Sequence, residues 1–335
     1  MTALTRAQVL AYRWVALLQD GVLGTGVQDN PPGRTATLAL QARGVETAAE
    51  DVVLVHGARG AAHMHRVEDR GLFAAALQIE DPQDLMPAQF GALVAELHGQ
   101  ELSFTWALDH VAEAMRAVTA DGTPRTKGEL SGALIDLVDA RLRPWCEGCG
   151  AFHVHDALFR WATLQAGLVI DSPRYLPGPP FERRDPEAAR REVVRRFLHL
   201  TGPARPAHLA AWLALSPAGA RKWWPDDLAS VTVDGRRSEV LAEDLDALRS
   251  APAPADVRLL PPYDPLTELA DRELLVPDRA QRTRVWRAST NPGVLVADGE
   301  IAGVWRRPRR AVEVEPFHRI DEDRVRAAIA VMDGA

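Results

Sequence analysis

The chain has 335 residues, 47% of them apolar and 25% charged, and a mean hydropathy of −0.15. This composition is typical of a globular protein, and the length suits two or more domains with a sizeable core. No apolar run approaches the roughly eighteen residues of a membrane span, and the N-terminal sequence MTALTRAQVL lacks the features of a secretory signal. Because Cys146 and Cys149 are the only cysteines, a disulfide framework is excluded, and we expect a cytoplasmic protein.

The formal net charge is −7 and the isoelectric point about 5.8, which argues against a strongly basic surface for nucleic acid. A local basic face remains compatible with this balance. All but two of the 39 basic residues are arginine, the exceptions being Lys127 and Lys222. Together with the many alanines and prolines, this usage indicates a GC-rich coding bias. The abundance of arginine therefore does not by itself indicate affinity for nucleic acid.

The first part of the chain predicts two helices followed by a β-hairpin. Thr5 begins a helix whose apolar residues recur at helical spacing, and a second helix runs to about Arg43. Residues 51–57 form an apolar run typical of a buried strand, and residues 61–66 follow after an Arg-Gly turn as its hairpin partner. Helix, helix and hairpin in this order are the plan of a winged helix.

The loop between these two helices holds the polar tripeptide Gln28-Asp29-Asn30 before a Pro-Pro pair. Asn followed by Pro is a helix-start signal, so the simplest interpretation is that Asn30 caps the second helix. The alternative is that Gln28 and Asn30 project from the N-terminus of that helix into a ligand cleft. Backbone N–H groups at such a terminus already favour anionic partners.

The same plan recurs twice, by pattern and without sequence identity between the copies. In the second copy Ser103 caps a helix, Thr126 and Glu129 form a capping box, and a helix over 156–165 precedes a strand over 167–171. Residues 172–184 are rich in Pro and Gly and are predicted to be a linker. The third copy has predicted helices at 186–200, 210–215 and 216–224 and an Asp-Gly hairpin at 231–237.

After a predicted linker at 251–255, the sequence pattern changes from helical to strand-like. Short strand-like runs joined by turns favour a small β-barrel, with predicted strands at 257–260, 294–297, 301–305 and 311–314. The predicted fold is therefore α+β, with three tandem winged-helix motifs followed by a small C-terminal β-barrel. The corresponding segments are 1–100, 101–178, 179–250 and 251–335.

A group of two cysteines and two histidines is the best candidate for a metal site. Cys146, Cys149, His153 and His155 lie within ten residues, and thiolates with imidazoles suit tetrahedral zinc. Zinc sites usually combine two separated ligand pairs, so the alternative is a surface turn with two thiols that bind no metal. We expect that the protein requires no cofactor, and that any bound metal is a structural zinc at these residues.

Basic and polar side chains near the turns of the three motifs are candidates for DNA contacts. They are Arg43, Arg59, His63, His65, Arg66, Arg125, Thr126, Lys127, Arg205 and Lys222. His63 and His65 alternate with Met64 and so share one face of a strand. An ordinary solvated surface or a polar strand face is the alternative for each. Signatures of P-loop, zincin and esterase chemistry are absent from the sequence.

Several segments resemble the winged-helix DNA glycosylases of the AlkZ/YcaQ type. The matching segments are Leu23-Gly-Thr-Gly-Val-Gln-Asp-Asn-Pro-Pro, Leu38-Ala-Leu-Gln-Ala-Arg43, Gly57-Ala-Arg-Gly-Ala-Ala-His-Met-His65, Arg125-Thr-Lys-Gly-Glu-Leu130, Leu259-Leu-Pro-Pro-Tyr-Asp264, Asn291-Pro-Gly293 and Asp298-Gly-Glu-Ile-Ala-Gly-Val-Trp-Arg306. The resemblance covers most of the chain and implies the same three winged helices and β-barrel. It also implies excision of alkylated or crosslinked bases from double-stranded DNA without a metal.

The resemblance places the catalytic motif at Gln28-Asp29-Asn30. The family pattern is Gln-x-Gln or Gln-x-Asp with an apolar middle residue, so Asn30 replaces the second motif residue and Asp29 adds a charge. As a glycosylase acting on alkylated purines, the protein would use Gln28 to position water and Asp29 to stabilise charge or act as base. Asn30 would cap the helix and hold the water.

Two other function classes remain open from the sequence. The first is a non-catalytic DNA-binding regulator or damage sensor, and the second is a protein-interaction module that has kept the fold. The sequence specifies neither the lesion nor the oligomeric state.

Overall fold

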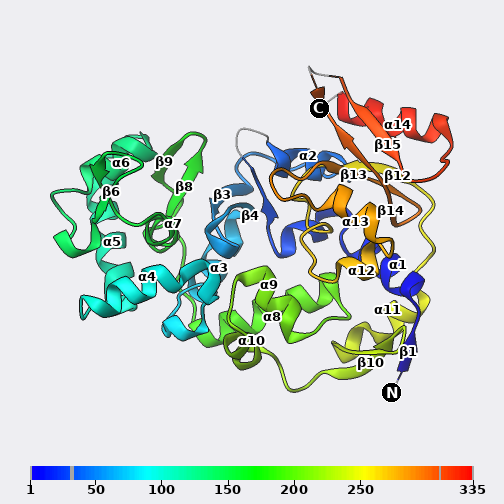
Figure 1. Cartoon of the computed structure of the whole chain (residues 1–335), viewed down its shortest axis with the longest axis horizontal. Helices are drawn as coiled ribbons and strands as arrows, with labels where there is room; N and C mark the ends of the chain where they lie inside the picture. Colours follow the sequence, from blue (N-terminus) through cyan, green and yellow to red (C-terminus); the bar gives the residue numbers. More distant parts are fainter. Residues whose placement is uncertain (1, 31–33, 309–310, 334–335) are drawn as a thin grey trace. The chain divides into compact units, whose positions relative to one another are not determined.

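The computed structural model describes residues 2–30, 34–308 and 311–333 as a mixed α+β fold (Figure 1). The chain divides into two compact units built from non-contiguous segments. Unit 1 comprises residues 1–47, 194–208 and 225–335, and unit 2 comprises 48–193 and 209–224. These borders cut across the four consecutive segments expected from the sequence.

The N-terminal helix of unit 1 begins where the sequence predicts. Thr5 caps α1 (Arg6–Ala16) and forms a capping box, in which the Gln8 N–H donates to Thr5 Oγ1 at 3.3 Å. The apolar face of α1, with Leu10 and Trp14, packs into the same core as the C-terminal strands. The preceding strand β1 (Thr2–Leu4) pairs in parallel with β10 (Ala229–Val233).

The hairpin of β10 and β11 (Arg236–Val240) turns at Asp234-Gly235, as predicted. Both turn residues have positive φ, 46° and 79°, which is the conformation that Asp-Gly hairpin turns require. The remaining short elements of unit 1 are β2 (Val27–Gln28), α2 (Thr35–Gln41), α11 (Leu245–Ser250), α12 (Arg272–Leu275) and α13 (Arg279–Val285).

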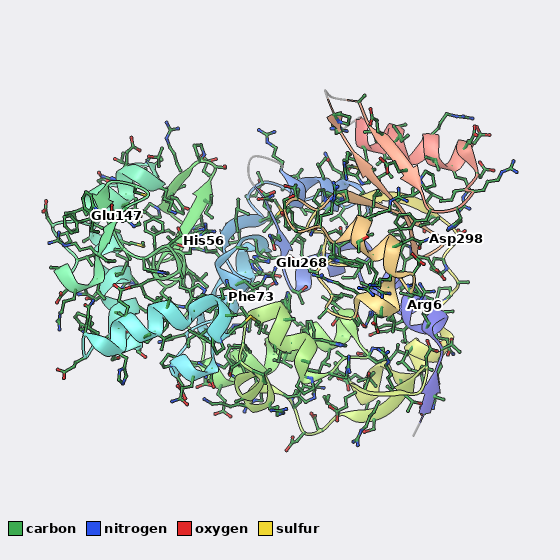
Figure 2. The ribbon with its side chains drawn as sticks, viewed as in Figure 1. Arg6, His56, Phe73, Glu147, Glu268 and Asp298 are labelled. Atoms are coloured by element: carbon green, nitrogen blue, oxygen red, sulfur yellow. The ribbon has the colours of Figure 1, made fainter. Side chains whose placement is uncertain are left out.

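The C-terminal strands form an open antiparallel sheet, which corrects the predicted barrel. Its order is β12 (Val257–Leu260), β13 (Gly293–Ala297), β14 (Glu300–Arg306) and β15 (Glu313–Pro316), and β12 and β15 do not pair in the described part of the chain. Helix α14 (Glu322–Asp333) packs against β12, contributing Ala328 and Met332 to the core. The helix therefore packs on the first strand of an open sheet. Asp298, labelled in Figure 2, begins the predicted turn between β13 and β14.

Unit 2 begins with the predicted hairpin of β3 (Val52–His56) and β4 (Ala62–Arg66), in which Val55 pairs with His63. The first helices after it are α3 (Arg70–Ala76) and α4 (Pro87–Gly99). Val55, Ala74 and Leu164 form a buried cluster that joins the hairpin to α3 and to α7 (Asp156–Gln165). The sequence pattern did not predict α3 and α4.

The predicted caps of the second motif are confirmed. Ser103 caps α5 (Phe104–Thr119), and Thr126 with Glu129 forms the capping box of α6 (Lys127–Ala133). The predicted linker at 172–184 is partly a strand, because β9 (Arg174–Pro177) pairs with β8 (Leu168–Asp171). On its other side β9 pairs with β5 (Arg125–Thr126). Its proline, at the end of the strand, does not interrupt this pairing.

The third helical segment also follows the prediction. It consists of α8 (Pro186–Thr201), α9 (Pro206–Leu213) and α10 (Pro217–Trp223), and the border between the units falls within α8 and α9. Ser216 caps α10 through the Gly219 N–H at 3.1 Å. Among the helices of the described residues, none combines the length and the apolar character needed to cross a bilayer.

Candidate functional site

The tripeptide Gln28-Asp29-Asn30 leaves strand β2 and lies against the N-terminus of α2. Asp29 Oδ1 accepts a hydrogen bond from the Ala36 N–H at 3.0 Å. Thr35 Oγ1 accepts the Asn30 N–H at 2.9 Å and donates to the Gln28 carbonyl oxygen at 3.2 Å. The backbone of the tripeptide is thus fixed to the first turn of α2 by Asp29 and Thr35.

This geometry corrects the prediction that Asn30 caps the helix. Helix α2 begins at Thr35, and Arg34 at its N-cap position has left-handed backbone (φ 49°) and no side-chain cap bond. The Asp29 carboxylate satisfies one of the first helical N–H groups instead. The Pro31-Pro32 pair that suggested the earlier start lies outside the described residues.

Exposure increases along the chain from β2 through the tripeptide. Val27 is fully buried and Gln28 is half-buried, and Asn30 is exposed. Asp29 is half-buried like Gln28, and its carboxylate contacts the start of α2. Of the two amide side chains, Asn30 is therefore the more accessible to solvent.

A pocket of about 500 Å³ in unit 1 adjoins this loop through Thr35. Its lining residues are Thr35, Leu38, Pro262, Arg287, Ser289, Thr290, Asn291, Pro292, Gly293, Trp305, Arg306 and Arg307. The lining is apolar at Leu38, Pro262 and Trp305 and holds three arginines. No acidic residue is among the described residues that line it. Such a pocket suits an aromatic or anionic group.

Two segments that carried the family resemblance shape this pocket. Trp305 donates its indole N–H to the Leu260 carbonyl oxygen at 2.8 Å. A Cβ at Gly293 would lie 2.2 Å from the Trp305 ring nitrogen, so only glycine allows this close approach. The glycine of the Asn291-Pro-Gly293 segment is therefore explained by its close packing against Trp305.

Arg43 and Asp264 form a buried ion pair in unit 1. The guanidinium contacts both carboxylate oxygens, at 2.6 and 2.8 Å, and also donates to the Leu17 and Ala39 carbonyl oxygens. Their side chains are 1% and 0% exposed. The structure gives no support to the predicted DNA contact of Arg43, because its guanidinium is buried and paired inside unit 1.

Comparison with known proteins identifies the family of this chain. The model of the AlkZ-like DNA glycosylase family matches residues 22–332, which is most of the chain. The chain belongs to the AlkZ-like DNA glycosylase family. Over 146 residues it is 32% identical to a Streptomyces sahachiroi protein described as an interstrand DNA cross-link repair glycosylase. That match spans 40% of this chain and 38% of the relative's length.

A solved structure shows the fold of this AlkZ-like chain at full length. The Streptomyces sahachiroi DNA glycosylase AlkZ superposes with a TM-score of 0.75 at 22% sequence identity. The superposition covers 100% of this chain and 98% of that one. Similarity at this level of identity establishes the shared fold.

The histidines of the β3–β4 hairpin in this AlkZ-like chain are buried. His63 and His65 are each 1% exposed, and the His65 ring lies 4.0 Å from that of Phe73 (Figure 2 labels Phe73 and His56). Burial, then the Arg59 charge, lowers the pKa of His63. His56 Nδ1 lies 2.8 Å from Thr163 Oγ1. The two histidines predicted to contact DNA, or else to form a polar strand face, are therefore shielded from solvent in this structure.

The other residues predicted to contact DNA have partners within unit 1 or unit 2. Arg59 donates to the Trp212 carbonyl oxygen at 2.5 Å, and Thr126 caps α6. The charged or ring partners are Asp69 for Arg66, Asp121 for Arg125, Asp156 for Lys127, His208 for Arg205 and Asp84 for Lys222. Lys127 and Lys222 remain half exposed in their pairs. Asp156 is also half exposed, whereas Asp84 is mostly buried, so only the Lys127–Asp156 pair is of the exposed and weak kind.

The predicted metal ligands come together in part. The ligand atoms of Cys146, Cys149 and His153 lie within 4.8 Å of one another. His155 does not join them, because its Nδ1 accepts the Ala157 N–H at 3.2 Å and caps α7. Sequence spacing could not separate the two histidines, since only the start of α7 assigns His155 to the helix.

Proposed function

We propose that this protein is a monofunctional DNA glycosylase that hydrolyses the N-glycosidic bond of alkylated purines in double-stranded DNA. Membership in the AlkZ-like family supports the reaction class. The single observation that carries the assignment of residues is the fixed tripeptide, in which Asp29 and Thr35 hold Gln28 and Asn30 beside a pocket. The curated relative's description extends the candidate substrates to crosslinked purines.

The proposed reaction needs only a positioned water. The bond between C1′ and the purine nitrogen breaks, and its electron pair neutralises the cationic alkylated base. Water adds to C1′ and loses a proton to solvent, which leaves an abasic site. The Gln28 amide oxygen accepts a hydrogen bond from this water, and Asn30 provides a second polar contact. Because an N7- or N3-alkylated base leaves readily, an amide that cannot take up a proton is sufficient.

Asp29 has a different role from the one expected from the sequence. Its contact with the Ala36 N–H makes it a positioning residue, since it orients the loop that carries Gln28 and Asn30. The carboxylate still lies next to the site and contributes negative potential to a developing oxocarbenium ion. This division of roles accounts for a charged residue at the middle position of the motif.

We further propose that the protein binds DNA through winged-helix elements. The hairpins β3–β4, β8–β9 and β10–β11 each follow helices, which is the plan of three winged helices. The exposed guanidinium groups of Arg287 and Arg306 at the pocket are additional phosphate contacts. Affinity should fall as salt rises, by roughly one power of salt per phosphate neutralised.

One observation favours a second candidate function, a non-catalytic sensor of DNA damage. The tripeptide has amides at both motif positions, and its only carboxylate is engaged with α2. A protein of this kind would recognise the altered base and retain it without hydrolysis.

An excision assay with parallel binding measurements separates the two functions. Duplexes containing N7-methylguanine, an alkyl interstrand crosslink or no damage are incubated with the protein, and abasic sites are cleaved and resolved on a gel. Fluorescence anisotropy at low and moderate salt measures binding to the same duplexes. Excision of either lesion supports the glycosylase, whereas damage-selective binding without excision supports the sensor. Absence of binding at low salt refutes both.

A further inference from the structure

A short hairpin in unit 2 carries a feature that base excision does not use. Strands β6 (Trp145–Cys146) and β7 (Ala151–Phe152) pair in antiparallel register, with Cys146 opposite Ala151. The amides of Cys149 and Gly150 donate to the Cys146 carbonyl oxygen at 3.2 and 2.8 Å. This closes a tight turn, at which Glu147 is labelled in Figure 2, and it brings the two thiols together.

His153 completes the group and has the tautomer of a metal ligand. Its Nδ1 lies 2.8 Å from the Val154 carbonyl oxygen, which can only accept, so Nδ1 carries the proton. The lone pair is then on Nε2. That atom is buried, and it faces the Cys146 thiol, the first of the two sulfur atoms of the group. A histidine that donates one ring N–H to a carbonyl and keeps the other nitrogen for a ligand is the usual arrangement at metal sites.

From this geometry we propose that Cys146, Cys149 and His153 bind one zinc ion. Zinc–sulfur and zinc–nitrogen bonds of about 2.3 and 2.0 Å in a tetrahedron place the ligand atoms roughly 3.5–3.8 Å apart. The three atoms already lie within 4.8 Å of one another, so the site needs to contract by only about an ångström. Two thiolates and a neutral imidazole balance the charge of the ion and suit its softness.

The fourth coordination position belongs to water. Within the described ranges, no further Cys, His, Asp or Glu places a ligand atom in this cluster. His155 is the nearest histidine in sequence, and it caps α7. Cys149 is exposed, so solvent reaches the open position.

The ion acts on the structure of the hairpin. Two-residue strands provide too few hydrogen bonds to be stable alone, and the hairpin has an exposed aromatic pair in place of a core. Trp145 and Phe152 are 49% and 54% exposed and pack edge to face across the strands. A metal that joins the turn to His153 fixes this register and holds both rings on one rigid surface.

Cobalt substitution tests the site on the full-length reduced protein. After removal of metal with a chelator, Co²⁺ should bind at one equivalent, with thiolate charge-transfer and tetrahedral d–d absorption that zinc abolishes by displacement. Cys149→Ser and His153→Ala should each lose the tetrahedral spectrum. His155→Ser is the matched control, since serine retains the helix cap, and it should behave as wild type. A wild type without stoichiometric metal, or a His153→Ala variant indistinguishable from His155→Ser, overturns the proposal.

Hydrogen exchange of residues 145–152 provides a second readout that does not depend on variants. Zinc should slow amide exchange in the hairpin and leave exchange in α1 unchanged. Unchanged hairpin exchange at saturating zinc would refute the structural role. A Cys146–Cys149 disulfide that persists under reducing conditions and blocks metal uptake would refute the site itself. None of these measurements depends on excision activity, so the zinc proposal and the glycosylase proposal fail separately.

Discussion

Replacing Arg43 by alanine tests the structural role of the buried ion pair between Arg43 and Asp264. The guanidinium makes four hydrogen bonds, two to Asp264 and two to the carbonyl oxygens of Leu17 and Ala39. The Asp264 carboxylate is 0% exposed, and removal of Arg43 leaves it without its counter-charge. Removing one partner of a buried pair typically costs about 3–5 kcal/mol of unfolding free energy, so we expect a loss in this range.

Urea unfolding followed by tryptophan fluorescence measures this loss. Three variants form the cycle: Arg43→Ala, Asp264→Ala and the double substitution. The double variant should lose less than the sum of the single losses, by at least about 1 kcal/mol, because it no longer buries an unpaired charge. Arg43→Lys should also be destabilised, since an ammonium group cannot reproduce the two-pronged contact.

The DNA-binding role first expected for Arg43 gives the opposite pattern. If Arg43 contacted phosphate, Arg43→Ala would weaken DNA binding and leave the unfolding free energy within about 0.5 kcal/mol of wild type. That result would refute the structural role of the Arg43–Asp264 ion pair.

Two further predictions concern capping and pH. Asp29→Ala should lower the unfolding free energy by about 1 kcal/mol, whereas Asn30→Ala should change it little, because the carboxylate caps α2; equal losses in urea unfolding would restore Asn30 as the cap. Burial and then the Arg160 charge lower the pKa of His56 from 6.5 to about 3. The folded state therefore keeps His56 neutral, so stability present above pH 6.5 is lost as pH falls towards 3. The melting temperature of wild type should fall more steeply over this range than that of His56→Gln, and parallel curves would contradict the assignment.

Local signals predicted many elements of this fold correctly. The helix start at Thr5 and the caps at Ser103 and Thr126 were confirmed because each signal lies within three residues of the helix end. The Asp-Gly turns were also predicted correctly, since few residue pairs tolerate two successive positive φ angles.

Contacts between residues far apart in the sequence could not be predicted from these local signals. Asp29 caps α2 from seven residues upstream of Ala36, and the left-handed Arg34 separates the Asn-Pro signal from the true start. Arg43 and Asp264 are 221 residues apart. The family resemblance marked both segments, but only the fold shows that an ion pair joins them.

The proposed active site is tested most directly by single-turnover excision of N7-methylguanine with Gln28→Ala. Gln281→Ala in α13 is the matched control, because it makes the same truncation in unit 1 outside the residues that line the pocket. Loss of one water-positioning contact should slow excision about ten-fold or more, with DNA affinity and unfolding free energy nearly unchanged. The Gln281→Ala rate should equal that of wild type. Equal rates for Gln28→Ala and wild type would contradict the assignment of Gln28 to the reaction.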